Sequence, residues 1–145
     1  MCAASALLAL FMAQSPAQTA DARVGRLTVS HAWSRPTPPA AAVAAVYFSI
    51  TNSGATADAL VAVSTPIAAK VELHESRNVQ GVIEMREVPS VPCPAGATVN
   101  SEPGGLHVML VGLNRPLIAG TTFPVSLRFR DAGVVTLEVA VANRE

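Results

Sequence analysis

The apolar residues of this chain come in short runs, and each run is closed by turn-forming residues. Clusters of Pro, Gly, Asn and Asp stand at residues 36–39, 52–54, 92–96, 103–105, 114–116 and 131–133. No run between them is long enough, or periodic enough at 3.6 residues, to favour a helix. Eight of the runs are instead typical of β-strands: residues 27–33, 43–51, 59–64, 68–74, 82–88, 106–113, 123–130 and 134–141.

Short strands at this spacing predict an all-β sandwich of Greek-key type. Alternation is cleanest in the last run, where one face carries Val135, Leu137, Val139 and Val141. Half of the 145 residues are hydrophobic but only 4% are aromatic, so the core must be mainly aliphatic and the chain is not a disordered one. No repeat or linker interrupts the pattern, and we expect a single domain.

The charges and motifs exclude several classes of function. Ten Lys and Arg residues balance ten Asp and Glu residues, and the basic ones are scattered singly. Nucleic acids and anionic membranes need a clustered basic surface, so we expect neither as a partner. The chain also lacks a nucleophile elbow, a phosphate-binding loop, a His-Glu zinc motif and a C-x-x-C pair, and we expect no enzymatic activity.

The N-terminus has the composition of an export signal. About a dozen uncharged small or apolar residues precede a polar stretch at residues 14–21, and this run is too short to span a bilayer. Ala20-Asp21-Ala22 offers an A-x-A cleavage site, and Ser15-Pro16-Ala17 offers another. We expect residues 1–22 to be a signal peptide and residues 23–145 to be the mature, monomeric domain. A frayed apolar N-terminus is the alternative.

Removal of residues 1–22 would leave one cysteine, Cys93, and two methionines, Met85 and Met109. A single cysteine forms no internal disulfide, so packing must hold the exported domain together. Each remaining methionine lies near a histidine, in the spacing His74-x10-Met85-x21-His107-x-Met109. Two imidazoles and two thioethers are neutral and mostly soft ligands, which suit copper(I) better than zinc, calcium or magnesium.

Strand geometry favours convergence of these four residues. Residues two apart on a strand point to the same side, so His107 and Met109 form a two-pronged clamp. His74 is expected at the end of its strand, on the solvent side, and a hairpin return through residues 78–81 could bring Met85 alongside it. The alternative is that the methionines fill the core and the histidines are ordinary surface or hydrogen-bonding residues.

Five segments of the chain resemble those of a known protein family. The resemblance covers nearly the whole mature chain, in the segments 31–39, 45–52, 71–74, 81–85 and 103–110. With the four-residue spacing given above, these segments resemble the PCu(A)C family of periplasmic copper(I) chaperones. The resemblance implies a cupredoxin-like β-sandwich in the periplasm that holds one copper(I) through His74, Met85, His107 and Met109.

The resemblance also implies partners. The copper ion would be delivered to the copper subunit of apo-cytochrome c oxidase, at its dinuclear CuA centre, and a Sco-type thiol copper protein is a further expected partner. Periplasmic copper storage or resistance would use the same site with a different acceptor. A copper electron carrier and a metal-free interaction sandwich are the remaining alternatives.

Three further features lie outside the four residues. His31 is expected to be a structural histidine near the core edge, or alternatively a support for the metal ligands. Cys93 lies between two prolines in an expected turn, and we expect a free surface thiol. The acidic residues that flank the ligand segments are expected to form a solvated face, or alternatively a negative rim for docking a partner: Glu72, Glu75, Glu84, Glu87 and Glu102.

Overall fold

The computed structural model describes residues 20–144, and the regular structure of these residues is entirely β. Their strands form one continuous 11-stranded sheet. The strands are β1 (Ala22–Val24), β2 (Leu27–Ser34), β3 (Val43–Asn52), β4 (Asp58–Ser64), β5 (Ala68–Val79), β6 (Val82–Glu87), β7 (Val91–Cys93), β8 (Thr98–Asn100), β9 (Leu106–Leu113), β10 (Thr122–Phe129) and β11 (Gly133–Val141).

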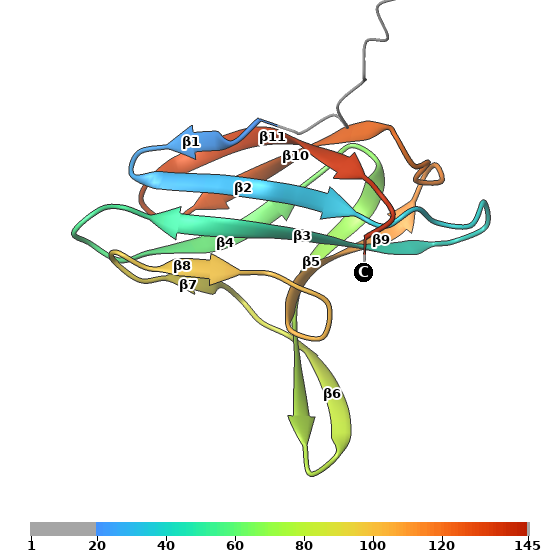
Figure 1. Cartoon of the computed structure of the whole chain (residues 1–145), viewed down its shortest axis with the longest axis horizontal. Helices are drawn as coiled ribbons and strands as arrows, with labels where there is room; N and C mark the ends of the chain where they lie inside the picture. Colours follow the sequence, from blue (N-terminus) through green and yellow to red (C-terminus); the bar gives the residue numbers. More distant parts are fainter. Residues whose placement is uncertain (1–19, 145) are drawn as a thin grey trace, which may run out of the picture.

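The sheet folds over on itself (Figure 1). Its strands are hydrogen-bonded in the order β6-β5-β9-β3-β2-β11-β10-β4-β7, with β1 attached to β2 and β8 attached to β3. β4 and β5 lie near opposite ends of this order, yet they contact each other. The two halves of the sheet therefore face one another across a shared core, as the predicted sandwich requires.

All eight predicted strands are confirmed as strands. One of them is longer than predicted, because the run at residues 68–74 continues as β5 to Val79. The three strands that were not predicted, β1, β7 and β8, have 3 residues each, which is too few to show alternation. Pro92 lies within β7, and this is tolerated because β7 is the last strand in the sheet order.

The core is mainly aliphatic, as predicted. Its largest fully buried side chains come from strands of both halves of the sheet: Phe123, Phe129, Leu27, Ile50, Leu60, Leu110, Leu127, Val29, Val46, Val108, Val125 and Val139. Burial of each such side chain contributes about 1.5–3 kcal/mol. Because side chains alternate along a strand, Val108 and Leu110 anchor β9 to this core and leave His107 and Met109 on its opposite face.

A β-bulge interrupts β2 between Ser30 and Trp33. Val29 is buried before the bulge and Ala32 is buried after it, so the bulge changes which positions face the core. His31 lies in the bulge with a φ of 56° and is exposed. The prediction that His31 lies near the core edge is therefore wrong, because strict alternation does not continue through a bulge.

The prediction of a surface thiol at Cys93 is also wrong. Cys93 is 1% exposed, and it lies opposite Asp58 in the ladder between β4 and β7. Its backbone carbonyl accepts a hydrogen bond of 3.0 Å from the amide of Asn52, and burial is the main cause that raises the pKa of its thiol. The prolines on either side of Cys93 mark a short edge strand that covers the core, and not an exposed turn.

Most of the predicted signal peptide, residues 1–19, lies outside the described residues, and the division at residue 22 stays a prediction. Ala22 is the first residue of β1 and pairs with Val29. Within residues 20–144, no helix has the length and apolar character needed to cross a membrane.

Candidate metal centre

Three neighbouring strands, β6, β5 and β9, carry the four predicted metal ligands. Directly across the ladder between β5 and β9, His74 lies opposite His107. Two positions further along β9, Met109 lies opposite Glu72. Residues paired in this way share a face of the sheet, so both histidines and Met109 lie on one face.

The ladder between β5 and β6 adds the fourth residue to that face. Met85 pairs with Ser76, which is two positions from His74 on β5. Alternation places Ser76 and His74 on the same side of the strand, and Met85 follows its partner. The fold thus brings all four predicted ligands onto one face of three adjacent strands.

The two imidazoles lie side by side and are largely shielded from solvent. Their ring centroids are 5.6 Å apart, and the ring planes are inclined at 58°. His107 is 5% exposed, and the side chain of His74 is 15% exposed. The prediction that His74 ends its strand is wrong, because β5 continues beyond it to Val79. The predicted side is correct, since His74 lies on the face opposite the buried Leu73, where its side chain is partly exposed.

The ring of His107 has one nitrogen engaged and one free. Its Nδ1 lies 3.0 Å from the backbone oxygen of Gly105. A carbonyl oxygen only accepts hydrogen bonds, so Nδ1 must be the nitrogen that carries hydrogen. In the neutral imidazole the other nitrogen, Nε2, then keeps its lone pair and is the atom able to bind a metal.

The ring of His74 is arranged in the opposite sense. Its Nε2 lies 2.7 Å from Oε2 of Glu72, whose other oxygen forms an ion pair with Lys70. Hydrogen bonds from Lys70 first, and from His74 second, lower the pKa of Glu72, so this residue is a carboxylate that accepts hydrogen from Nε2. The remaining nitrogen of His74, Nδ1, is buried and has no hydrogen-bond partner within the described residues.

Met85 lies on a hairpin that extends away from the rest of the sheet (Figure 1). Its turn is formed by Gln80 and Gly81, whose φ values of 52° and 83° are those of a type I′ turn. Every residue of β6 is exposed, and Met85 is 54% exposed. Its thioether is therefore open to an incoming molecule.

Met109 is partly buried and has different surroundings. It lines a cavity of about 350 Å³ together with Tyr47 of β3 and with residues 35–38. In the ladder between β3 and β9 it lies opposite Ala45. The small side chain of Ala45 and the cavity leave space on the side of Met109 that faces β3, away from β5.

The comparisons with known proteins identify the family. A family model described as "Putative lipoprotein LpqE-like" matches residues 27–141. The chain belongs to the LpqE-like family. A similar curated protein is "Putative lipoprotein Lxx21020" of Leifsonia xyli subsp. xyli, which is 34% identical over 132 residues, or 90% of this chain and 76% of that protein.

Several solved structures similar to this LpqE-like chain are named as PCuAC domains. The apo PCuAC domain from PmoF1 is 28% identical, with a TM-score of 0.76 over 86% of this chain and 100% of that one. The copper-bound PCuAC domain from PmoF2 is 26% identical, with a TM-score of 0.74 over 86% and 99%. The solution structure of CuI-DR1885 from Deinococcus radiodurans is 30% identical, with a TM-score of 0.62 over 82% and 78%.

These likenesses confirm two predictions for the LpqE-like chain. It is a PCu(A)C-type protein, and its fold is the predicted cupredoxin-like, all-β sandwich. The match extends from β2 to β11, and therefore includes the three strands that carry the predicted ligands.

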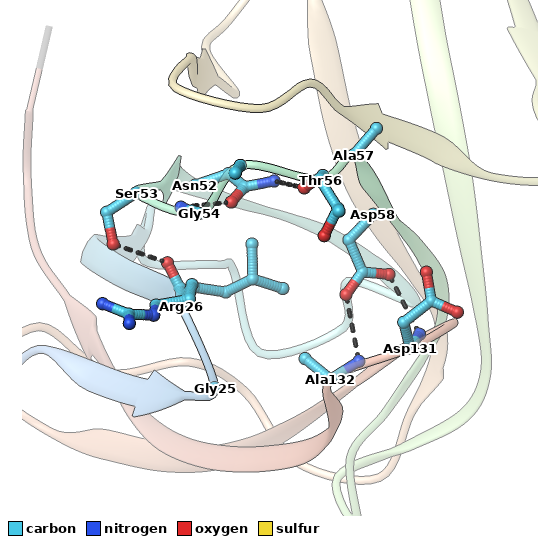
Figure 2. Close-up of a pocket in the computed structure, with 12 residues that line it drawn as sticks. Gly25, Arg26, Asn52, Ser53, Gly54, Thr56, Ala57, Asp58, Asp131 and Ala132 are labelled. Atoms are coloured by element: carbon cyan, nitrogen blue, oxygen red, sulfur yellow. Dashed lines mark hydrogen bonds between the residues drawn. The ribbon is translucent and has the colours of Figure 1, made fainter.

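A separate hollow of the LpqE-like chain lies at different residues (Figure 2). It has a volume of about 600 Å³ and is lined by Gly25, Arg26, Leu27, residues 52–58, Asp131 and Ala132. Asp58 is fully engaged there, because it accepts hydrogen bonds from the backbone nitrogens of Ala59, Asp131 and Ala132 at 2.7–3.0 Å. The carboxylate therefore stabilises the turn at Asp131 and Ala132. None of the predicted metal ligands lines this hollow.

Glu72 was expected among the acidic residues that flank the ligand segments, but its hydrogen bond to His74 was not predicted. Glu84, Glu87 and Glu102 are exposed, as a solvated acidic face requires, whereas Glu72 is partly buried and hydrogen-bonded to His74. The spacing of two residues between Glu72 and His74 was a usable signal, since it places both side chains on one face of a strand.

Proposed function

We propose that this protein is a copper(I) chaperone that holds its cargo with His74, Met85, His107 and Met109. The observation that carries the proposal is the ladder register that gathers these residues on one face. It is supported by Nδ1 of His74, because a buried nitrogen without a partner is costly unless a ligand satisfies it. It is further supported by the relatives whose names describe bound copper.

The donor chemistry favours copper(I) over other ions. Two thioethers are soft and uncharged, which suits a monovalent soft ion better than zinc, calcium or magnesium. The described part of the chain supplies one thiol, Cys93, which is buried in β7 on the edge strand and is not among these ligands. A site without thiolate also resists the oxidation that an exported cysteine ligand would suffer.

The different surroundings of the ligands suit transfer of the ion. His74 and His107 lie on strands that are anchored to the core, whereas Met85 lies on the exposed hairpin. An acceptor can therefore displace the weakly bound thioether of Met85 while the imidazoles still hold the ion. Release then needs no unfolding of the sandwich.

We further propose that the protein is exported to the periplasm and delivers copper to the CuA centre of cytochrome c oxidase, with a Sco-type thiol protein as a partner. Export is supported by the signal-like residues 1–22 and by a relative that is named as a lipoprotein. The oxidase as acceptor is supported only by the family resemblance.

A competition titration tests the binding. The mature protein is titrated with copper(I) in the presence of a chromophoric copper(I) chelator, and one ion should be bound per chain. His107→Ala and Met109→Leu should weaken binding, whereas His31→Asn should not. Asparagine is the matched control because it tolerates the positive φ of the bulge at His31. Equal affinity of all variants would contradict the proposed site.

A gene deletion tests the delivery. Loss of cytochrome c oxidase activity that is restored by added copper would support the chaperone role. Copper sensitivity with normal oxidase activity would instead support periplasmic storage or resistance.

A further inference from the structure

We infer that the two histidines present different ring nitrogens to copper(I), Nδ1 of His74 and Nε2 of His107, and that Glu72 is the positioning residue that selects the nitrogen of His74. This inference rests on the proposed function and deepens it, because it names the donor atoms and a residue that does not touch the ion.

The donor nitrogen of His107 follows from a backbone contact at the start of β9. The backbone of Gly105 is held in place by its own hydrogen bond, from its nitrogen to the carbonyl of Glu102 at 3.1 Å. Its carbonyl oxygen accepts from Nδ1 of His107, two residues later in the chain. This contact is local and backbone-mediated, so it forms whenever β9 forms. Nε2 is left as the donor atom.

The assignment for His74 depends on a side chain instead. Glu72 and His74 lie on the same face of β5, and a carboxylate oxygen approaches Nε2 to 2.7 Å. Lys70, two residues earlier on that face, binds the other oxygen of Glu72. The carboxylate is thus held from both sides along one strand, and it occupies the nitrogen that would otherwise be free for the metal.

The buried Nδ1 of His74 is the independent observation that points to a ligand. It is the one buried side-chain nitrogen or oxygen within residues 20–144 that has no hydrogen-bond partner. Native proteins leave few such atoms, because an unsatisfied buried polar atom is destabilising. The atom belongs to the ring that lies beside His107, so a metal bound between the two rings would satisfy it.

A carboxylate that accepts hydrogen from a ligating histidine has two effects. It fixes the orientation and tautomer of the ring, and it raises the basicity of the nitrogen that binds the metal. Without Glu72, the ring of His74 would sample both tautomers, and part of the population would present a protonated Nδ1 to the ion. We therefore expect weaker binding without any change in the four ligands.

The experiment observes the ring nitrogens directly by NMR of mature protein labelled with ¹⁵N-histidine. In the copper-free protein, His74 should carry hydrogen on Nε2 and His107 on Nδ1. Addition of copper(I) should shift the resonances of His74 Nδ1 and His107 Nε2, and leave each protonated nitrogen with its hydrogen. The same samples are titrated against a competing chelator.

Three variants separate positioning from general damage. Glu72→Leu should abolish the single tautomer of His74 and lower copper(I) affinity by about ten- to a hundredfold. Glu72→Gln, which keeps an oxygen that accepts hydrogen, should restore the tautomer and most of the affinity. Glu75→Leu is the matched control, since Glu75 is the next acidic residue of β5 but lies on the opposite face.

The outcomes distinguish the two proposals. Failure of the wild-type protein to bind copper(I) would contradict the proposed function, and the inference with it. Binding in which copper(I) shifts Nε2 of His74 would contradict the inference alone. Equal affinity of Glu72→Leu and wild type would also contradict it, because the positioning role requires that affinity falls.

Discussion

Met85 pairs with Ser76 across the β5–β6 ladder, two positions beyond His74. Met85 therefore lies on the exposed hairpin, whereas Met109, the other proposed sulfur ligand, lies on a strand anchored in the core. The two methionines should therefore respond differently to substitution, although they have the same chemistry.

Met85→Leu should weaken copper(I) binding by at least about tenfold, or about 1.4 kcal/mol, without destabilising the fold. Leucine keeps the size of the side chain but removes the sulfur, and exposed substitutions usually change stability by no more than about 0.5 kcal/mol. Urea unfolding and a chelator competition on one preparation measure both quantities. The control is Ile83→Leu, since Ile83 lies on the same face of β6 and is 74% exposed. Equal affinity of Met85→Leu and the control would contradict the ligand role.

Gly112 of β9 should tolerate alanine much less well than Gly120 does. Both glycines have positive φ, at 71° and 87°, so both substitutions carry the left-handed cost of about 1–2 kcal/mol. At Gly112 the added Cβ would also lie 2.9 Å from Cβ of Ala69, whereas at Gly120 nothing lies within 4 Å. The clash should add about 1–3 kcal/mol. Denaturant unfolding of the two variants measures the difference in their stability. Equal losses of stability would show that β5 and β9 move apart at Ala69 and Gly112 without strain.

Asp58 should make stability fall at acid pH. Burial raises the pKa of its carboxyl, but hydrogen bonds from Ala59, Asp131 and Ala132 outweigh this, and the folded-state pKa lies below the ordinary value of 3.8. A carboxyl with a lowered pKa contributes stability above its unfolded pKa and loses it as pH falls through the folded pKa. Urea midpoints measured from pH 7 down to pH 3 should therefore decrease for the wild type.

Asp58→Asn serves as the comparison for that pH series. At neutral pH it should cost about 1–3 kcal/mol, because three backbone donors lose a charged acceptor. Its midpoint should then decrease less steeply at acid pH than that of the wild type. Parallel pH profiles for the two proteins would show that other carboxyls cause the acid loss.

Cys93 should react with a thiol reagent only when the protein unfolds. Burial, the main cause, raises the pKa of its thiol, and its Sγ lies 3.6 Å from the carbonyl oxygen of Val91, which it faces inside the core. Thiolate is the reactive form, so labelling of the mature protein at pH 7 should be slow without denaturant and rapid in its presence. Rapid labelling in both conditions would indicate that β7 opens readily.

Local patterns were sufficient to predict most strands and to place His107 and Met109 on one face of the same strand. A strand alternates with a period of two, so residues two apart on it can be assigned to one face from the sequence alone. The same rule was wrong at His31, because a bulge adds a residue that alternation does not anticipate. It was also insufficient at Cys93, whose neighbouring prolines resemble a turn although Pro92 and Cys93 lie in an edge strand.

The hairpin return that brings β6 alongside β5 was predicted from its turn residues, but the pairing of β5 with β9 could not be predicted from residue patterns. His74 and His107 are opposite one another only because β5 and β9 pair in one register, and that register depends on the burial of residues such as Leu73 and Val108. The tautomers of the two rings depend on contacts at the scale of single atoms, with Glu72 and with Gly105. These contacts become visible only once the strands are in place.

The pairing of β5 with β9 also determines when the proposed cargo can bind. His74 and His107 are far apart in the chain, and residues between them form β6, β7 and β8, so an unfolded polypeptide holds no preformed nitrogen pair. A ligand that binds only the folded state adds its binding free energy to the stability of that state. The copper-loaded protein should accordingly be the long-lived form, and a molecule that has just given up its ion should be the one most exposed to proteolysis.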